Sequence, residues 1–325
     1  MTNKFEPTVA VTGAAGFLGG VIVRTLVASG VRVHRIARSS RTAVPGTVRH
    51  GWDPDRDAGP PAQGLQVDAV IDCAAALPSR VENPDALKST NARLVQGAID
   101  LAARKGGRLI YMSSQAVYGR PNCALIDADT PLAPATPYGE SKQAAERAVA
   151  AAVDDGRLAG AAVLRLPAVV GCGAHDNFPA AAAATLLRGE PVTVFNPQSP
   201  YNAVVDAETL AVFAALLAKT IDGFVAVSPA THPPITVVAA VEAIAAGLGC
   251  KPSLRFREAP HGAPIIDPGP AIALGMAPQS PASVLCRFGK MLASEVHCGP
   301  ERRTERTASS RLTGDAQRQS ARKRR

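Results

Sequence analysis

One stretch near the N-terminus decides the fold of this 325-residue chain: Val9-Ala10-Val11-Thr12-Gly13-Ala14-Ala15-Gly16-Phe17-Leu18-Gly19. A short β-branched run stops at a glycine turn and continues directly into an apolar-periodic segment that ends near residue 28. Glycines allow positive φ and remove the Cβ atoms that would keep an anion away from backbone N–H groups. The first turn of a helix attracts such an anion. The stretch is therefore either a dinucleotide pyrophosphate site or a plain strand-to-helix turn.

Strands and helices alternate from this stretch onward. Strands are expected at residues 31–36, 48–52, 67–72, 109–112 and 162–166, and helices at 17–28, 91–105 and 138–152. This order predicts an α/β fold with a doubly wound parallel sheet of the Rossmann type. Ligands of such sheets bind at the carboxyl ends of the strands, where the strand order reverses.

The second half of the chain follows a looser pattern. Helices are expected at residues 178–188, 207–219 and 236–247, strands at 192–195 and 224–227, and short strands in the proline-rich segment 252–283. We expect three parts: a dinucleotide-binding domain at 1–171, a small substrate lobe at 172–298 interleaved with the last sheet strands, and a disordered basic tail at 299–325. The tail has too few apolar residues to build a core.

The net charge of +8 comes mostly from this tail, which holds nine Lys/Arg against three Asp/Glu. The remaining 298 residues hold 26 Lys/Arg against 24 Asp/Glu. This near-neutral part of the chain does not predict a nucleic-acid partner. Six cysteines and six histidines are scattered, which predicts buried free thiols and no metal site. No secretory signal and no run of about 18 apolar residues is visible, so we expect a cytoplasmic protein without a membrane partner.

A second motif, Thr136-Pro137-Tyr138-Gly139-Glu140-Ser141-Lys142, begins the helix at 138–152. Tyr138 and Lys142 are four residues apart and share one helix face. The reference pKa of a phenol is about 10, and a nearby ammonium is expected to lower the pKa of Tyr138 so that it can act as a general acid or base. Ser114, at the end of a strand, could hold the same substrate oxygen. Alone, the Tyr-Lys spacing also fits a surface pair.

Several motifs occur in one order along the chain: Thr12-Gly13-x-x-Gly16-x-x-Gly19, Cys73-Ala74-Ala75, Asn91, Ser113-Ser114-Gln115-Ala116-Val117-Tyr118-Gly119, Pro137-Tyr138-Gly139-x-Ser141-Lys142 and Arg165-x-Pro167-x-x-x-Gly171. Together they resemble the extended short-chain dehydrogenase/reductases, the NAD-dependent epimerase/dehydratase family. The resemblance covers residues 8–290 and is strong from Val9 to Gly171.

The resemblance implies an enzyme with an NAD(P) cofactor, a small-molecule substrate and a homodimer built on two helices per subunit. Its catalytic residues would be Ser114, Tyr138, Lys142 and Asn91, of which Asn91 also fits a helix-start cap. Its cofactor-binding residues would be Gly13, Gly16, Phe17, Leu18, Gly19, Arg38, Asp53, Ala74, Tyr138, Lys142 and Pro167. Asp53, expected near the adenine, also fits an ordinary loop aspartate.

Three arginines follow or end the second strand, where family members that prefer NAD commonly carry an acid. Arg35, Arg38 and Arg41 could grip a 2′-phosphate, which an acidic residue would repel. Between NADP and NAD, the sequence therefore favours NADP slightly.

Two further departures narrow the function. Dehydratases and decarboxylases of the group carry an acidic residue just before Val-Tyr-Gly, where this chain has Gln115 and Ala116. Without a carboxyl group there to move a second proton, dehydration is disfavoured. Ser199, seven residues before Asp206, stands where nucleotide-sugar enzymes of the group usually carry an arginine for the diphosphate. Either other basic residues replace that arginine or the substrate is not a nucleotide sugar; the candidates are Arg188, Arg255 and Arg257.

These observations favour an NAD(P)-dependent oxidoreductase or epimerase that transfers hydride at a carbinol or ketone carbon of a sugar nucleotide or related small molecule. One alternative is an NADPH-dependent ketone or aldehyde reductase acting on a non-nucleotide substrate. Another is a non-catalytic dinucleotide-binding regulatory protein. The presence of Ser114, Tyr138 and Lys142 together argues against the last, because a sensor needs only the glycine turn.

Overall fold

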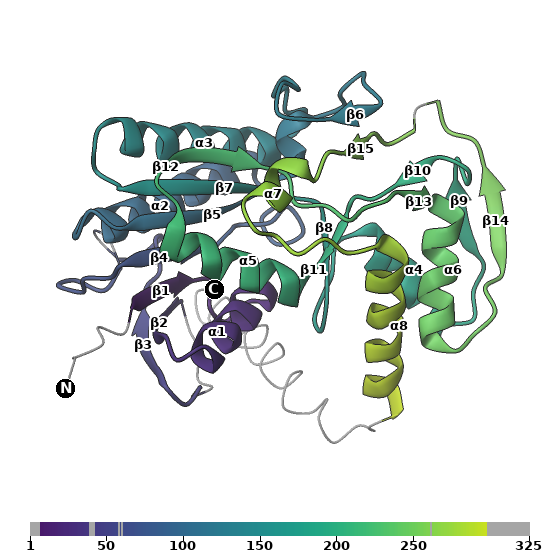
Figure 1. Ribbon diagram of the computed structural model, residues 1–325, viewed down its shortest axis with the longest axis horizontal. Helices are drawn as coiled ribbons and strands as arrows, with labels where there is room; N and C mark the ends of the chain where they lie inside the picture. Colours follow the sequence, from purple (N-terminus) through teal and green to yellow (C-terminus); the bar gives the residue numbers. More distant parts are fainter. Residues whose placement is uncertain (1–6, 39–42, 58, 60, 261, 298–325) are drawn as a thin grey trace, which may run out of the picture.

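The computed structural model describes residues 7–38, 43–57, 59, 61–260 and 262–297, so the predicted tail at 299–325 lies outside the described residues. A seven-stranded parallel sheet forms the larger part of the molecule (Figure 1). In spatial order its strands are β12 (Gly223–Val227), β7 (Gly160–Leu166), β5 (Arg108–Ser114), β4 (Ala69–Asp72), β1 (Thr8–Thr12), β2 (Arg32–Ala37) and β3 (Thr47–Gly51). Every neighbouring pair is parallel. The doubly wound α/β prediction is confirmed.

Helices cover both faces of the sheet. α1 (Phe17–Ala28) and α5 (Ala207–Thr220) pack on one face around an apolar core, and α2 (Pro84–Ala103) and α3 (Pro137–Asp154) pack on the other. The chain leaves β1 toward β2 on one side and returns to β4 on the other. The strand order therefore reverses between β1 and β4, which is where a doubly wound sheet binds its ligand.

The second half of the chain builds a smaller layer with its own apolar core, away from the main sheet (Figure 1). Its elements are β8 (Ala168–Val170), α4 (Phe178–Leu187), β9 (Val192–Phe195), β10 (Pro200–Tyr201), β11 (Val204–Asp206), β13 (Ile235–Thr236), α6 (Val237–Leu248), β14 (Leu254–Arg257) and α8 (Pro281–His297). η1 (Gln115–Tyr118), β6 (Leu125–Ile126) and β15 (Ile265–Ile266) share a small apolar cluster of their own, and α7 (Gly269–Ala273) packs into the core under α1 and α5. β12 belongs to this half in sequence but completes the main sheet.

Helices α6 and α8 of the smaller layer pack against each other at glycine residues. A Cβ on Gly247 of α6 would lie 2.2 Å from the carbonyl oxygen of Cys286, and one on Gly289 of α8 would lie 2.4 Å from that of Ile244. Both distances are far below any real Cβ contact, so only glycine allows these backbones to approach. Close helix packing on small residues is what the alanine-rich, aromatic-poor composition indicates.

Three expectations are corrected by the structure. α2 begins at Pro84, capped by Asn83, and not at 91, so Asn91 lies in mid-helix and is no start cap. The last helix, α8, was not expected from the pattern. Among the described cysteines, Cys123 and Cys250 are exposed because they lie in loops, whereas buried thiols were expected.

Candidate active site

The glycine turn packs against the turn that follows β4. Gly13 has a φ of +60°, and a Cβ there would lie 2.7 Å from the carbonyl oxygen of Cys73. A Cβ on Gly19 would lie 2.4 Å from the carbonyl oxygen of Gly13. α1 begins at Phe17, and its cap residue Gly16 offers no side-chain hydrogen bond to the first turn. The N–H groups of that turn therefore lack a side-chain cap, an arrangement that fits a pyrophosphate.

The start of α3 lies directly against the segment that follows β5. Thr136 caps the helix by accepting a hydrogen bond of 3.1 Å from the N–H of Gly139. A Cβ on Gly139 would lie 2.4 Å from the carbonyl oxygen of Ala116 in η1. Ser114 caps η1, with its Oγ accepting from the N–H of Ala116 at 3.2 Å. That bond uses an oxygen lone pair, so the hydroxyl hydrogen of Ser114 is left to donate elsewhere.

Lys142 lies one helical turn after Tyr138 and is 3% exposed. Its Nζ donates a 2.8 Å hydrogen bond to the carbonyl oxygen of Met112 and lies 5.8 Å from the ring centroid of Tyr138 and 4.7 Å from that of Tyr111. Burial opposes the charged form, but Tyr111, Tyr138 and Asp72 outweigh it and hold the pKa of Lys142 above its usual range. Lys142 is therefore a fixed ammonium beside the half-buried phenol of Tyr138.

Asn91 connects α2 to α3 and to the turn after β4. Its Oδ1 accepts from the N–H of Ala76 at 2.7 Å, and its Nδ2 donates to the carbonyl oxygen of Ala76 at 3.2 Å and to the Oγ of Ser141 at 3.0 Å. Ser141 in turn donates to the carbonyl oxygen of Tyr138 at 2.7 Å. Asn91 thus fixes the first turn of α3, which carries Tyr138.

Two ionisable residues at this site were not singled out from the sequence. Asp72 ends β4, and Tyr111 is its register neighbour on β5. Burial raises the pKa of Asp72 to about 6, against the opposing effects of Thr12, Lys142 and the N–H of Ala74. Burial also raises the pKa of Tyr111 to about 12. The signal available in the sequence was an acid at the end of the otherwise apolar run Ala69–Asp72.

A buried polar network continues from this site toward the smaller layer. Ser113 donates to the Oε1 of Glu146 at 2.5 Å, and the Nη2 of Arg165 lies 2.9 Å from the Oε2 of the same carboxylate. The Nη1 of Arg165 donates to the hydroxyl of Tyr118 at 3.0 Å, and that hydroxyl is 3.1 Å from the Oγ of Ser228. The network fixes the ends of β5 and β7 relative to α3.

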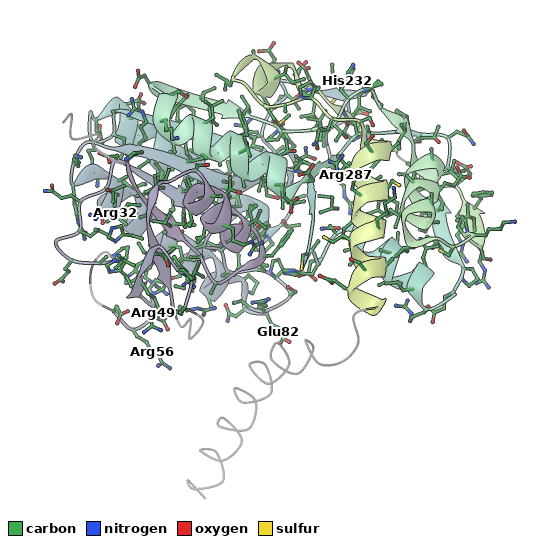
Figure 2. The ribbon with its side chains drawn as sticks, turned by 60° about the horizontal axis from the view of Figure 1, so that its bottom comes forward. Arg32, Arg49, Arg56, Glu82, His232 and Arg287 are labelled. Atoms are coloured by element: carbon green, nitrogen blue, oxygen red, sulfur yellow. The ribbon has the colours of Figure 1, made fainter. Side chains whose placement is uncertain are left out.

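The three arginines near the second strand have different positions. Arg35 lies inside β2 and is 4% exposed, and burial together with the charge of Arg49 lowers its pKa. Arg38 follows the end of β2 and is exposed, and Arg41 lies outside the described residues. Figure 2 shows Arg32 and Arg49 on this edge of the sheet. Arg38 is therefore the arginine that the structure leaves at the strand's carboxyl end.

The remaining predicted positions surround the strand ends. Ala74 donates its N–H to the Oγ1 of Thr12 at 3.3 Å, and Pro167 joins β7 to β8. Phe17 packs on Gly171, where a Cβ would lie 3.1 Å from its ring. Asp53 accepts from the N–H of Asp55 at 3.1 Å, so it forms a local turn.

Residues from both layers line a cleft of about 490 Å³ beside Gly171. Asp206 at the N-terminus of α5 and Arg287 of α8 form an ion pair of 2.8 Å on its wall. Ser199 lies in the connection between β9 and β10. Arg188 is paired with Glu190 at 2.8 Å, and Arg255 and Arg257 lie exposed on β14.

Two further observations bear on the kind of site. Within the described ranges, no helix has the length and apolar character needed to cross a lipid bilayer. In the same ranges, no three His, Cys, Asp or Glu side chains gather in a way that could hold a metal ion.

Comparison with known proteins places this geometry in a family. Residues 9–224 match the model of the NAD dependent epimerase/dehydratase family. A curated relative, the dTDP-6-deoxy-L-talose 4-dehydrogenase (NAD(P)(+)) of Kitasatospora kifunensis, is 32% identical over 174 residues, which are 51% of this chain and 53% of the relative. The chain thus spans about half the length of the curated relatives it matches.

Solved structures share the fold over most of the chain. The UDP-N-acetylglucosamine 4-epimerase of Methanobrevibacter ruminantium has a TM-score of 0.75 at 18% identity and covers 89% of this chain and 99% of its own. The UDP-glucose 4-epimerase of Thermus thermophilus, solved with NAD, has a TM-score of 0.65 at 22% identity, covering 87% and 99%. With the glycine turn, the Tyr-Lys helix and a family match that spans about two thirds of its length, this chain belongs to the NAD dependent epimerase/dehydratase family.

Proposed function

We propose that this protein is an NAD(P)-dependent oxidoreductase or epimerase that transfers hydride at a carbinol or ketone carbon of a sugar nucleotide or related small molecule. One observation carries the proposal: the buried ammonium of Lys142 lies 5.8 Å from the ring centroid of Tyr138, at the strand ends where the glycine turn also lies. The curated relatives are named as sugar-nucleotide epimerases and a dehydrogenase, which supports this substrate class.

The residues present fit a dinucleotide. Gly13 and Gly19 allow the turn to pack closely, and the first turn of α1 has no side-chain cap to compete with a phosphate. The remaining cofactor positions named from the sequence are proposed to contact the same dinucleotide, and Arg38, exposed after the end of β2, is proposed to meet the adenosine ribose. A bound nicotinamide would accept hydride from a carbinol carbon or return it to a ketone carbon.

The chain's own residues move the proton and hold the oxygen. When a carbinol is oxidised, its C–H bond breaks as hydride leaves, and the O–H proton passes to the Tyr138 phenolate. The buried ammonium of Lys142 supplies a fixed positive charge 5.8 Å from the ring centroid of Tyr138 while that proton is exchanged. Ser114 donates a hydrogen bond to the same substrate oxygen. In the reverse direction Tyr138 returns the proton to the alkoxide oxygen.

A second candidate is an NADPH-dependent ketone or aldehyde reductase. Arg38 is exposed at the carboxyl end of β2, and Ser199 replaces the arginine that the family resemblance expects for a diphosphate. Both observations suit a phosphorylated cofactor and a substrate without a diphosphate. We also propose that the protein forms a homodimer and that residues 172–298 supply the substrate-binding lobe.

The test is a panel assay of wild type and Tyr138→Phe with NAD and NADP against UDP-glucose, a dTDP-4-keto-6-deoxy sugar and simple ketones. Tyr138→Phe should bind dinucleotide as wild type does and lose most turnover, about 10²–10⁴-fold. An epimerase interconverts sugars without net cofactor consumption, whereas a reductase consumes NADPH stoichiometrically. An unimpaired Tyr138→Phe variant refutes the proposed role of Tyr138, and bound cofactor without turnover on any substrate favours the regulatory alternative.

A further inference from the structure

Three neighbouring strands place polar side chains in one row at their carboxyl ends. Thr12 of β1 is the register partner of Asp72 of β4, which is in turn the partner of Tyr111 of β5. Partners in register point to the same face of a sheet, and this face is the one that α2 and α3 cover. Asp72 is 1% exposed, so the row brings a carboxyl group into the interior below Lys142.

The two carboxyl oxygens of Asp72 differ in their hydrogen bonding. Its Oδ1 accepts from the hydroxyl of Thr12 and lies 3.3 Å from the N–H of Ala74. Its Oδ2 is buried and has no hydrogen-bond partner among the described residues. A buried carboxylate oxygen without a partner is costly, and a nearby cation is one way to offset that cost.

The groups that face Asp72 come from each surrounding element. β1 contributes Thr12, β5 contributes Tyr111, and α3 contributes Lys142, whose positive charge favours the ionised carboxyl. Cys73, next along the chain, is kept as a thiol because burial and then Asp72 raise its pKa. On α2, Asn91 is neutral and bonds to Ala76 and Ser141.

We propose that Asp72 is a positioning residue: its carboxylate is a buried counter-charge to Lys142 and thereby sets the pH window in which Tyr138 exchanges its proton. This inference rests on the proposed function. Lys142 lies 5.8 Å from the ring centroid of Tyr138, and the charge of Asp72 is among the causes that raise the pKa of Lys142. An ionised Asp72 partly cancels the field that the ammonium exerts on Tyr138, and a neutral Asp72 leaves that field whole.

The same placement has a consequence for folding that needs no substrate. The pKa of Asp72 is about 6 in the folded protein, above its ordinary value of 3.8. Below pH 3.8 the group is protonated in both states, and between these values only the folded state keeps the proton. Its contribution to stability is therefore present at low pH and lost as the pH rises through about 6.

The experiment compares wild type with Asp72→Asn, which keeps the shape of the side chain and removes its charge. Melting temperatures are measured from pH 4 to pH 8. Relative to wild type, Asp72→Asn should gain stability as the pH rises, with the gain complete above pH 7. Asp68→Asn is the matched control, because Asp68 precedes the same strand, is part-exposed and pairs with Lys105. Hydrogen bonds from Lys105 and the N–H of Thr8 lower the pKa of Asp68 below its ordinary 3.8 despite its partial burial. Relative to wild type, this control should therefore lose stability with rising pH only at the acid end of the range, and its profile should be level above about pH 5.

The second measurement is the pH dependence of kcat/KM for alcohol oxidation with the best substrate and cofactor of the panel. In Asp72→Asn the acidic limb should move to lower pH by about one unit, with the plateau kept, because the full field of Lys142 acts on Tyr138. A lowered plateau without a shift, or no change in either measurement, overturns the inference. If Asp72→Asn does not fold, Asp72→Ser removes the same charge and is judged by the same two curves.

The two proposals fail in distinguishable ways. An active Tyr138→Phe variant removes the proposed function, while the melting curves still report whether Asp72 carries a buried charge. Parallel melting profiles of Asp72→Asn and wild type remove the inference about Asp72, while an inactive Tyr138→Phe variant leaves the proposed function standing.

Discussion

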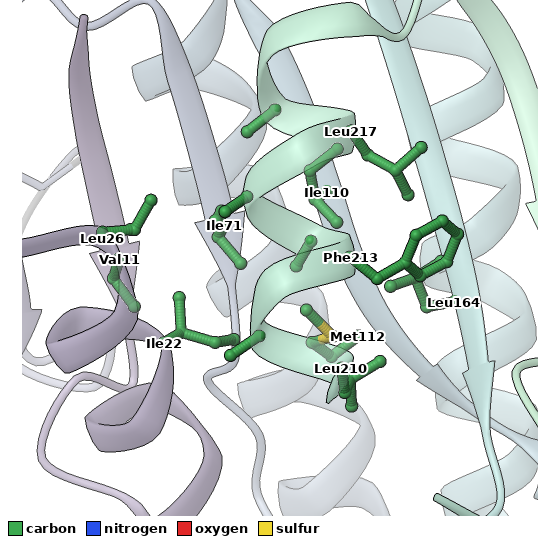
Figure 3. Packing of buried hydrophobic residues seen from close by; sticks show 14 of the residues in the cluster. Val11, Ile22, Leu26, Ile71, Ile110, Met112, Leu164, Leu210, Phe213 and Leu217 are labelled. Carbon is green, nitrogen blue, oxygen red and sulfur yellow. The ribbon is translucent and has the colours of Figure 1, made fainter. Parts of the chain in front are cut away.

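The two faces of the central sheet are built by adjacent residues of the same strands and have opposite character. The face under α1 and α5 is apolar up to the carboxyl ends (Figure 3), with Val11, Ile71, Ile110 and Met112. The next residue in each of these strands faces α2 and α3 and is polar: Thr12, Asp72, Tyr111 and Ser113.

The apolar face of the sheet therefore contributes mainly to folding stability, and the polar face carries the groups of the candidate active site. Burial of apolar side chains is the main favourable contribution to folding, whereas a buried polar group costs free energy unless it is hydrogen-bonded. The polar row lies where Lys142 and Glu146 of α3 meet the strand ends. We therefore expect changes on the apolar face to lower stability alone, and replacement of Lys142, which lies against the polar row, to lower activity first.

The largest effect is expected for Lys142→Met. Without the ammonium, kcat/KM should fall about 10³-fold, within the range that acid-base groups contribute. At pH 5, below the pKa of about 6 of Asp72, that carboxyl group is protonated and needs no counter-charge. The free energy of unfolding measured there should stay within about 1 kcal/mol of wild type, because removing the buried ammonium also removes its desolvation cost. Steady-state kinetics and urea unfolding measure the two effects. Lys105→Met, at an exposed lysine, is the control and should leave kcat/KM unchanged; a large loss of stability in Lys142→Met would break the comparison.

Phe213→Ala tests the opposite face. Phe213 of α5 is 1% exposed in the apolar core, and truncation should lower the free energy of unfolding by about 3–4 kcal/mol. The kcat of the folded enzyme should not change. Val212→Ala is the matched control, since Val212 is 60% exposed on the same helix and should cost less than about 0.5 kcal/mol. A variant with normal stability and reduced kcat would contradict the division between the faces.

Glu146→Gln tests a polar-face group that lies away from Tyr138. The variant keeps an acceptor for Ser113 but leaves the guanidinium of Arg165 without its counter-charge, and it should lose about 2–3 kcal/mol of stability. The double variant Glu146→Gln/Arg165→Met should regain part of this loss, because no unpaired charge remains. Denaturant unfolding of both variants decides the point, and equal stabilities of Glu146→Gln and wild type would show that the pair contributes little.

The smallest effect concerns the edge of the sheet. Arg38→Ala should raise KM for NADP about tenfold and leave KM for NAD unchanged, since a charged hydrogen bond contributes about 1.5–3 kcal/mol. Arg32→Ala, at the opposite end of β2, should change neither value. Cofactor titration of the three proteins measures the ratio. A clear preference of the wild type for NAD would end the NADP hypothesis.

Local patterns predicted much of this molecule. The strand-turn-helix at Val9–Gly19 and the four-residue spacing of Tyr138 and Lys142 are short-range signals, and the structure brings those two side chains to one place. The sequence did not predict that Asp72 and Tyr111 belong to the site, because only the register of β4 with its neighbours puts them in one row.

Two helix assignments failed for reasons that can be named. The α8 helix was not predicted because the segment before it is rich in proline. Its helical period is visible in the apolar residues Val284, Leu285, Phe288, Met291 and Leu292. The predicted start of α2 at Asn91 is wrong because an asparagine there resembles a helix cap. The residue that caps the helix is Asn83, which precedes Pro84.

The order in which the sheet is completed has a consequence during protein synthesis. β12 pairs with β7, but residues 167–222 must be made between them. Until Gly223–Val227 leave the ribosome, β7 presents an open row of backbone donors and acceptors to any passing strand. A fragment ending at residue 171 would carry that open edge permanently, so a fragment built on the main sheet should continue through Val227 to avoid aggregation.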